Sequence, residues 1–159
     1  MQLLFQQFTS LRHIALVGKI PTKTMEIDGM NIVLQLWELS NNEGHRQVNR
    51  HSLSCAAGAL IVYDITDRNS FESISAKWLT EAKLYGSPEL EVLLVGNKND
   101  LGQEYIGFQC RRAVSYEEAA QFAQDNSVSF MELSAKSAEI VDEVGVSTLR
   151  LLQDVPREF

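Results

Sequence analysis

Apolar residues recur along the chain in short segments that alternate between two spacings. Apolar or alternating segments predict strands at residues 22–27, 32–37, 59–63, 91–95 and 128–133. Between two of them, helical spacing predicts a helix that carries Phe71, Ile74, Trp78, Ala82 and Tyr85. Strands that alternate with helices indicate an α/β fold with a mostly parallel sheet covered on both faces. We expect one domain over residues 1–159.

Turn and capping residues mark where several of these elements begin and end. Asp28-Gly29 between two alternating segments predicts a β-hairpin, and therefore one antiparallel strand. The run Ser115-Tyr116-Glu117-Glu118 has the pattern of a capping box and predicts a helix to about Asp125. Two more helical patterns are a short stripe at Leu3, Leu4 and Phe8 and a final helix at Val141, Val144, Leu149 and Leu152, ended by Pro156.

Three predicted strands end in clusters of polar residues. These clusters occupy residues 38–43, 97–100 and 134–136. Ligands of open α/β sheets bind beyond the carboxyl ends of the strands. The sequence therefore predicts a ligand site where the three clusters meet.

Net charge and cysteine content indicate which partners and which cellular compartment to expect. The chain has 159 residues and a net charge of −7, which argues against nucleic acid as a partner. Cys55 and Cys110 show no metal or redox spacing, which fits a reducing, cytoplasmic setting. We expect no membrane span, and no membrane anchor because the C-terminus carries no cysteine for prenylation.

The second and third clusters resemble the base-reading loops of Ras-like GTPases. The matching motifs are Asn97-Lys98-Asn99-Asp100 and Ser134-Ala135-Lys136. The resemblance implies that Asp100 accepts the N1–H and the exocyclic amine of guanine, a charge-assisted bidentate contact. It also implies that the stem of Lys98 lies over the purine and that the Ala135 N–H meets O6. Adenine lacks this donor pair.

Nearly the whole chain resembles the Rab family in particular. The similar segments are residues 33–37, 56–66, 70–79 and 117–123. The sequence of these segments is most similar to that of Rab proteins of early and recycling endosomes. The resemblance implies a Ras-like three-layer sandwich, a GTP/GDP switch with Mg²⁺, effectors and regulators as partners, and association with endosomal or vesicle membranes.

The start of the chain departs from the Rab pattern. We expect it to begin in the family's first helix, with Met1 where the phosphate-loop lysine belongs and Gln2 where the magnesium-binding Ser/Thr belongs. The first central strand is then missing. Its five or six buried residues correspond to roughly 8–18 kcal/mol, against a domain stability of about 5–15 kcal/mol. We expect the neighbouring strands to pair directly, a partner to donate a strand into the slot, or the chain to fold poorly.

The segment that positions water in the family also differs. Glu38 stands where the family has a magnesium-binding aspartate, and its side chain is longer. Asn41 replaces a glycine. Asn42 replaces the catalytic glutamine, and its side chain is one methylene shorter. Ala15 aligns with the magnesium-binding threonine of the first switch. An insertion of about six residues lies around residues 105–110.

The effector surface of Rab proteins is only partly matched. Trp37 matches one aromatic of the family's surface triad, and its alternative role is that of a core aromatic at a strand end. The other two aromatics are not retained: Ile20 stands at the first of these two positions and Ser52 or Leu53 at the second.

Three hypotheses for function follow. The first is a Rab-like guanine-nucleotide-binding domain in vesicle trafficking, with impaired hydrolysis, in a truncated gene model or isoform. The second is a pseudo-GTPase that acts as an interaction module without nucleotide. The third is a non-functional fragment of a degenerate gene copy.

Overall fold

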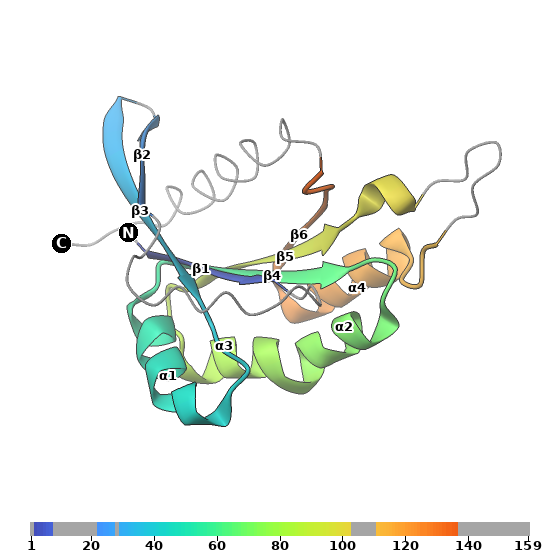
Figure 1. The fold of residues 1–159 in the computed structure, drawn as a ribbon, viewed down its shortest axis with the longest axis horizontal. Coiled ribbons are helices and arrows are strands. Elements are labelled where there is room, and N and C mark those ends of the chain that lie inside the picture. Colours follow the sequence, from blue (N-terminus) through green and yellow to red (C-terminus); the bar gives the residue numbers. More distant parts are fainter. Residues whose placement is uncertain (1, 8–21, 28, 103–110, 137–159) are drawn as a thin grey trace.

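A single mixed sheet organises the part of the chain that the structure describes. The computed structural model describes residues 2–7, 22–27, 29–102 and 111–136. The strand order is β2-β3-β1-β4-β5-β6, and all neighbours are parallel except the β2–β3 pair (Figure 1). The strands are β1 (Gln2–Gln7), β2 (Thr22–Ile27), β3 (Met30–Glu38), β4 (Gly58–Asp64), β5 (Glu91–Asn97) and β6 (Ser129–Glu132). The predicted α/β class is confirmed.

The hairpin at one edge of the sheet forms as predicted. Strands β2 and β3 are antiparallel, with Thr22 opposite Gln35 and Ile27 opposite Met30. Gly29 lies in the turn with a φ of 77°, a conformation that L side chains rarely adopt. This glycine therefore permits the tight connection that sets the register of the two strands.

The central position of the sheet is filled by the N-terminal segment, so the prediction of a missing central strand is wrong. Strand β1 pairs with β3 from Gln2 opposite Gln35 to Phe5 opposite Glu38. On its other side it pairs with β4, from Leu3 opposite Gly58 to Gln7 opposite Val62. Strands β3 and β4 therefore do not pair directly, and the chain's own residues leave no place for a donated strand. Poor folding stays a prediction.

The predicted helical stripe at the N-terminus is also wrong, and the reason is physical. Short helices are marginal in water because each must repay the cost of nucleation. The same six residues gain hydrogen bonds to two strands when they lie between β3 and β4. Unpaired backbone groups in the middle of a sheet are costly, so pairing outweighs the weak helical pattern.

The described α-helices cover one face of the sheet (Figure 1). They are α1 (Arg46–Cys55), α2 (Arg68–Ser73), α3 (Leu79–Tyr85) and α4 (Tyr116–Asn126). The short helices are η1 (Glu43–His45), η2 (Ile74–Trp78) and η3 (Asn99–Leu101), of which η3 follows the end of β5. Strand β4 is buried along its whole length. Its residues Ala59, Ile61 and Tyr63 face the helices, and Leu60 and Val62 join a second cluster with residues of β5.

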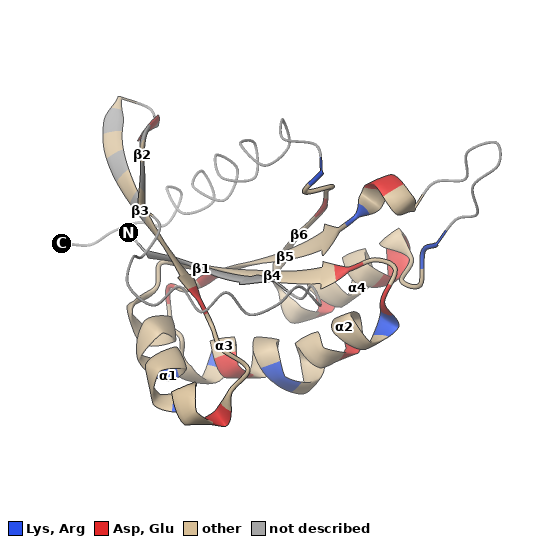
Figure 2. Ribbon diagram, in the orientation of Figure 1, with Lys and Arg blue, Asp and Glu red and all other residues tan. Residues whose placement is uncertain are grey.

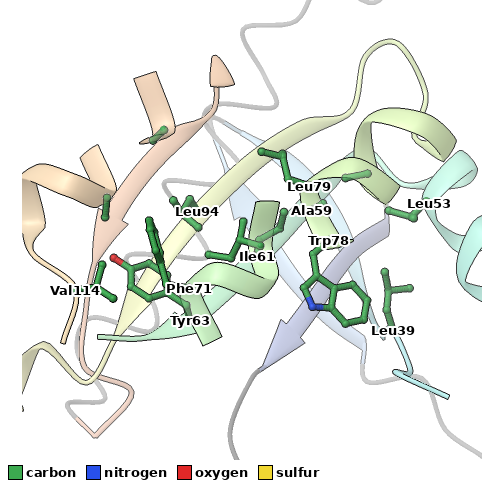
Figure 3. Packing of buried hydrophobic residues seen from close by; sticks show 14 of the residues in the cluster. Leu39, Leu53, Ala59, Ile61, Tyr63, Phe71, Trp78, Leu79, Leu94 and Val114 are labelled. Atoms are coloured by element: carbon green, nitrogen blue, oxygen red, sulfur yellow. The ribbon is translucent and has the colours of Figure 1, made fainter. Parts of the chain in front are cut away.

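The core between sheet and helices is built around aromatic contacts. The rings of Tyr63 and Phe71 meet edge to face at 5.0 Å, and those of Phe71 and Phe122 at 5.3 Å. Figure 3 shows Tyr63, Phe71 and Trp78 among aliphatic side chains of β4 and β5. Burial of this apolar surface, at ~25 cal/mol per Å², is the main favourable contribution to folding.

The helix predicted from Phe71 to Tyr85 is confirmed as three consecutive helical segments. Helix α2 continues into the π-helical η2 and then into α3. The Thr80 hydroxyl donates to the Ser75 carbonyl at 3.0 Å across this wider turn. The π-turn adds a residue between apolar positions and still keeps Ile74, Trp78 and Leu79 buried.

Helix α4 is confirmed and α1 is an element that the apolar pattern missed. The Ser115 hydroxyl accepts from the Glu118 N–H at 3.1 Å and caps α4. In α1, by contrast, the buried residues are Asn49, Ser52 and Leu53, so only one large apolar side chain marks the inner face. The predicted final helix, Ala15, Ile20 and the insertion at 105–110 lie outside the described residues, as does any helical layer on the second face of the sheet.

Replacing a residue of β1 by proline tests the central position of this strand. Leu4 lies opposite Trp37 and Ala59. We expect Leu4→Pro to lower the free energy of unfolding by at least about 1–3 kcal/mol, because a facing carbonyl loses its donor. Leu4→Val is the control, because it keeps the amide and suits a strand. Urea denaturation measures both, and equal stability of the two variants would place residues 2–7 outside the sheet.

Candidate functional site: two loops at the carboxyl ends of the strands

Charged residues of both signs follow the carboxyl ends of β4, β5 and β6 (Figure 2). Asp64 ends β4 and Asn97 ends β5, and the two residues lie opposite each other in the sheet. Ser134 and Lys136 follow β6. The clusters after β5 and β6 therefore lie at the same edge of the sheet.

The first loop turns sharply at Lys98. Asn97 is buried, and its side-chain oxygen accepts from the Lys98 N–H at 2.8 Å. Lys98 adopts a left-handed conformation with a φ of 68°, uncommon for a residue with a side chain. The Asn99 N–H donates to the Leu133 carbonyl at 3.1 Å, which ties the turn to the end of β6. Helix η3 then presents Asp100 to solvent.

The second loop is joined to the first by two side chains. The Ala135 N–H donates to the same Asn97 oxygen at 3.0 Å. The Ser134 hydroxyl donates to Asp100 Oδ1 at 2.7 Å and accepts from the Lys136 N–H at 3.2 Å. Asn97 and Ser134 therefore hold the two loops side by side, as the sequence predicts.

This arrangement fits the edge of a guanine base. Asp100 is exposed, and its second oxygen has no partner among the described residues. A carboxylate held by one hydroxyl still has lone pairs for two neighbouring N–H donors. The Ala135 N–H differs from expectation, because it already donates to Asn97 and can reach a ligand oxygen only by sharing its proton.

Lys98 forms an ion pair that the sequence did not reveal. Its Nζ lies 2.5 Å from Asp64 Oδ2, and the Asp64 side chain is only 12% exposed. Asp64 Oδ1 also accepts from the Thr66 N–H at 2.9 Å and from the Thr66 hydroxyl at 2.7 Å. The one signal in the sequence was a carboxylate at the end of a continuously apolar strand. Asp64 thus orients the lysine of the first loop.

Comparison with known proteins agrees with this geometry. A family model described as "Ras family" matches residues 1–154. The chain belongs to the Ras family. Three curated relatives are each 39% identical to it over 131 residues, namely Ras-related protein Rab-4B of Rattus norvegicus, Homo sapiens and Mus musculus. The match covers 82% of this chain and 58% of each relative, so the chain spans little more than half of their length. The predicted Rab resemblance is confirmed.

The third polar cluster of this Ras-family chain lies apart from the two loops. Glu38 ends β3, two strands away from β4, and Phe5 of β1 lies opposite both Glu38 and Leu60. Leu60 is four residues before the end of β4 (Gly58–Asp64). The described residues contain no group of three histidine, cysteine or acidic side chains that could hold a metal ion. The described residues of the two loops therefore fit the recognition of a base edge.

Side chains hold the segment after β3 in one conformation. The Asn49 side chain accepts from the Ser40 N–H at 3.2 Å and donates to the Ser40 carbonyl at 2.7 Å. The Lys77 Nζ lies 2.5 Å from Asn41 Oδ1. The Asn42 oxygen accepts from the Gly44 N–H at 2.9 Å and caps η1. The carboxamide of Asn42, which we predict to stand at the position of the catalytic glutamine, thus has a structural partner.

The surroundings of Trp37 are those of a core aromatic at the end of a strand. It is partly buried and packs against the core, and its indole N–H is buried without a hydrogen-bond partner among the described residues. A role for Trp37 on an effector surface stays a prediction. In the described part of the chain, no helix is both long and apolar enough to span a membrane.

Removing the Asn49 side chain tests how the segment after β3 is held. Asn49 is buried and bonds both backbone groups of Ser40. We expect Asn49→Ala to lower the free energy of unfolding by about 1–3 kcal/mol, because it leaves two partly buried backbone groups of Ser40 unpaired. Asn31→Ala, at an exposed position of β3, is the matched control and should change stability by less than about 0.5 kcal/mol. Comparable losses in both would contradict the contact.

The Asp64–Lys98 pair predicts a pH dependence of stability. Burial raises the pKa of Asp64, but hydrogen bonds from Lys98 and Thr66 outweigh it and hold the pKa below its usual range. The carboxylate therefore stabilises the fold above the unfolded-state pKa of about 3.9, and the contribution is lost as the pH falls through the folded-state value.

We expect Asp64→Asn to lower the free energy of unfolding at pH 7 by about 1.5–3 kcal/mol. The difference from the original protein should shrink below about pH 4 as the carboxylate is protonated. Urea denaturation between pH 3 and 7 measures it. A difference that stays constant across this range would contradict a charged Asp64.

Proposed function

We propose that this chain is a Rab-type guanine-nucleotide-binding domain of vesicle trafficking whose capacity for GTP hydrolysis is impaired. The observation that carries the proposal is the double contact of the Asn97 side-chain oxygen, which joins the two base-reading loops. Membership of the Ras family supports GTP or GDP as the ligand. The similarity to Rab-4B supports the trafficking role, with effectors and regulators as partners.

Selection of guanine follows from the residues of the two loops. Asp100, steadied by Ser134, accepts the N1–H and the 2-amine of guanine. Lys98 is placed by Asp64 with its stem beside the base. Asn97 keeps Ala135, and Ser134 keeps Lys136, within reach of the same ligand. Adenine presents no donor pair to Asp100, and the unsatisfied carboxylate disfavours it by roughly 1–3 kcal/mol.

Impaired hydrolysis follows from the segment after β3. Asn42 is shorter than the family glutamine, and its oxygen caps η1. Glu38 has no neighbouring carboxylate, histidine or cysteine with which to form a three-ligand site among the described residues. Magnesium, which the family uses with the nucleotide, supplies charge neutralisation for phosphates when bound. We expect weak nucleotide affinity and slow release of phosphate.

A second candidate, a pseudo-GTPase that acts as an interaction module, is favoured by one observation. The contacts from Asn49 and Lys77 hold residues 40 and 41 through side chains of the chain itself. A partner could then recognise this segment in a conformation that no phosphate controls. Absence of guanine-nucleotide binding together with a stoichiometric co-purified protein would support this candidate over the first. Absence of both would support the fragment hypothesis.

Exchanging the carboxylate of Asp100 for a carboxamide tests guanine recognition. Xanthine carries a carbonyl where guanine carries the 2-amine, so an asparagine can donate to it and still accept from N1–H. We expect the original chain to bind GDP about 10–100-fold more tightly than xanthosine diphosphate, a difference of roughly 1.5–3 kcal/mol. Asp100→Asn should reverse the preference.

Isothermal calorimetry with GDP, ADP and xanthosine diphosphate measures these affinities. Asp125→Asn is the matched control, because Asp125 is an exposed residue of α4 whose carboxylate accepts from Gln121. It should leave all three affinities unchanged. Equal affinity of the original chain for GDP and ADP would contradict guanine selection.

A further inference from the structure

A second, more buried ion pair lies beneath the two base-reading loops. Arg112 Nη1 is 2.7 Å from Glu132 Oε1, and Arg112 Nη2 is 2.8 Å from Glu132 Oε2. The Glu132 side chain is 8% exposed and that of Arg112 is 22% exposed. Arg112 Nη1 also donates to the Val114 carbonyl at 3.1 Å. A two-bond contact of this kind fixes orientation as well as distance.

Glu132 lies where both loops leave the sheet. It is the last residue of β6 and lies opposite Gly96, which immediately precedes Asn97. Two residues after Glu132 comes Ser134, which holds Asp100. The space around Gly96 is narrow, since an added Cβ would lie 2.8 Å from the Tyr63 hydroxyl and 3.0 Å from Glu132 Cγ. Movement of Glu132 is therefore passed on to both loops.

Arg112 contacts the far end of the first loop. An added Cβ at Gly102 would lie 2.7 Å from Arg112 Nη2 and 2.9 Å from Ile65 Cδ1, so the guanidinium packs directly on this glycine. The Gly102 N–H donates to the Asn99 carbonyl at 3.0 Å and closes the turn that carries Asp100. Next to Arg112, the Arg111 N–H donates to the Leu101 carbonyl at 3.1 Å.

We propose that Arg112 and Glu132 form a clamp that sets the spacing between the two base-reading loops, so that Arg112 is a positioning residue for guanine recognition. This inference rests on the proposed function. Arg112 touches the turn after Asp100, and Glu132 holds the strand that leads into Ser134. The clamp thus fixes where the Asp100 carboxylate lies relative to the Ala135 N–H. A base that contacts both groups requires that separation.

Variants that keep the fold can separate clamping from general stability. Loss of Arg112 alone leaves a buried, uncompensated carboxylate and destabilises the protein. The double variant Arg112→Met with Glu132→Met replaces the pair by apolar side chains, a change that is often neutral for stability. Arg112→Lys keeps the charge but cannot form the two parallel bonds. It therefore tests geometry apart from charge.

We expect the double variant and Arg112→Lys to bind GDP about tenfold more weakly, since the clamp is coupled to the loops. The ratio of GDP to ADP affinity should fall in parallel, a change that a merely structural role would not produce. The matched control replaces Arg68 and Glu118, an exposed pair 2.6 Å apart between α2 and α4, by methionines. This control should change neither the affinity nor the ratio.

Calorimetry with GDP and ADP, together with thermal unfolding of each variant, decides between the outcomes. An unchanged GDP affinity and selectivity in a folded double variant would overturn the clamp and leave the proposed function standing. Absence of GDP binding by the original chain would overturn the proposed function and with it the positioning role. A parallel fall in affinity and selectivity in the two clamp variants, with an unaffected control, would support it.

Discussion

Backbone hydrogen bonding in the middle of the sheet is the constraint on which the rest of the structure depends. Strand β4 is buried on both faces, and its backbone groups have no water to bond. Strand β1 satisfies one edge of β4 and β5 satisfies the other. With β3 paired to the outer edge of β1, the carboxyl ends of β4 and β5 are held in register, so Asp64 and Asn97 lie opposite each other.

The loops beyond these strands are held by a small set of shared partners. One oxygen of Asn97 serves two N–H groups, and Ser134 joins Asp100 to the second loop. Beneath them, Asp64 and Glu132 each hold a basic side chain. Recognition of a base edge requires that donors and acceptors be placed before the ligand arrives, and these contacts place them. The segment after β3 is organised separately by Asn49.

Much of the fold could be predicted because local signals agreed with the final structure. The hairpin at Gly29, the apolar strand β4 and the cap at Ser115 are local features. The strand β1 could not be predicted, because its pairing partners lie far along the chain and its own apolar pattern fits a helix as well. Helix α1 was missed because it buries polar side chains. Of the site, the motif residues were predictable, whereas the ion pairs of Asp64 and Glu132 join residues that are distant in sequence.

The parallel pairing of β1 has a consequence for the order in which the protein folds. Residues 2–7 are synthesised before the residues of β3 and β4, with which β1 pairs. Contacts of high sequence separation form slowly, because closing long loops costs entropy before any contact is gained. Strand β1 is thus synthesised before both of its partners but can join the sheet only after they have been made. Until then, the facing edges of β3 and β4 are open to other chains.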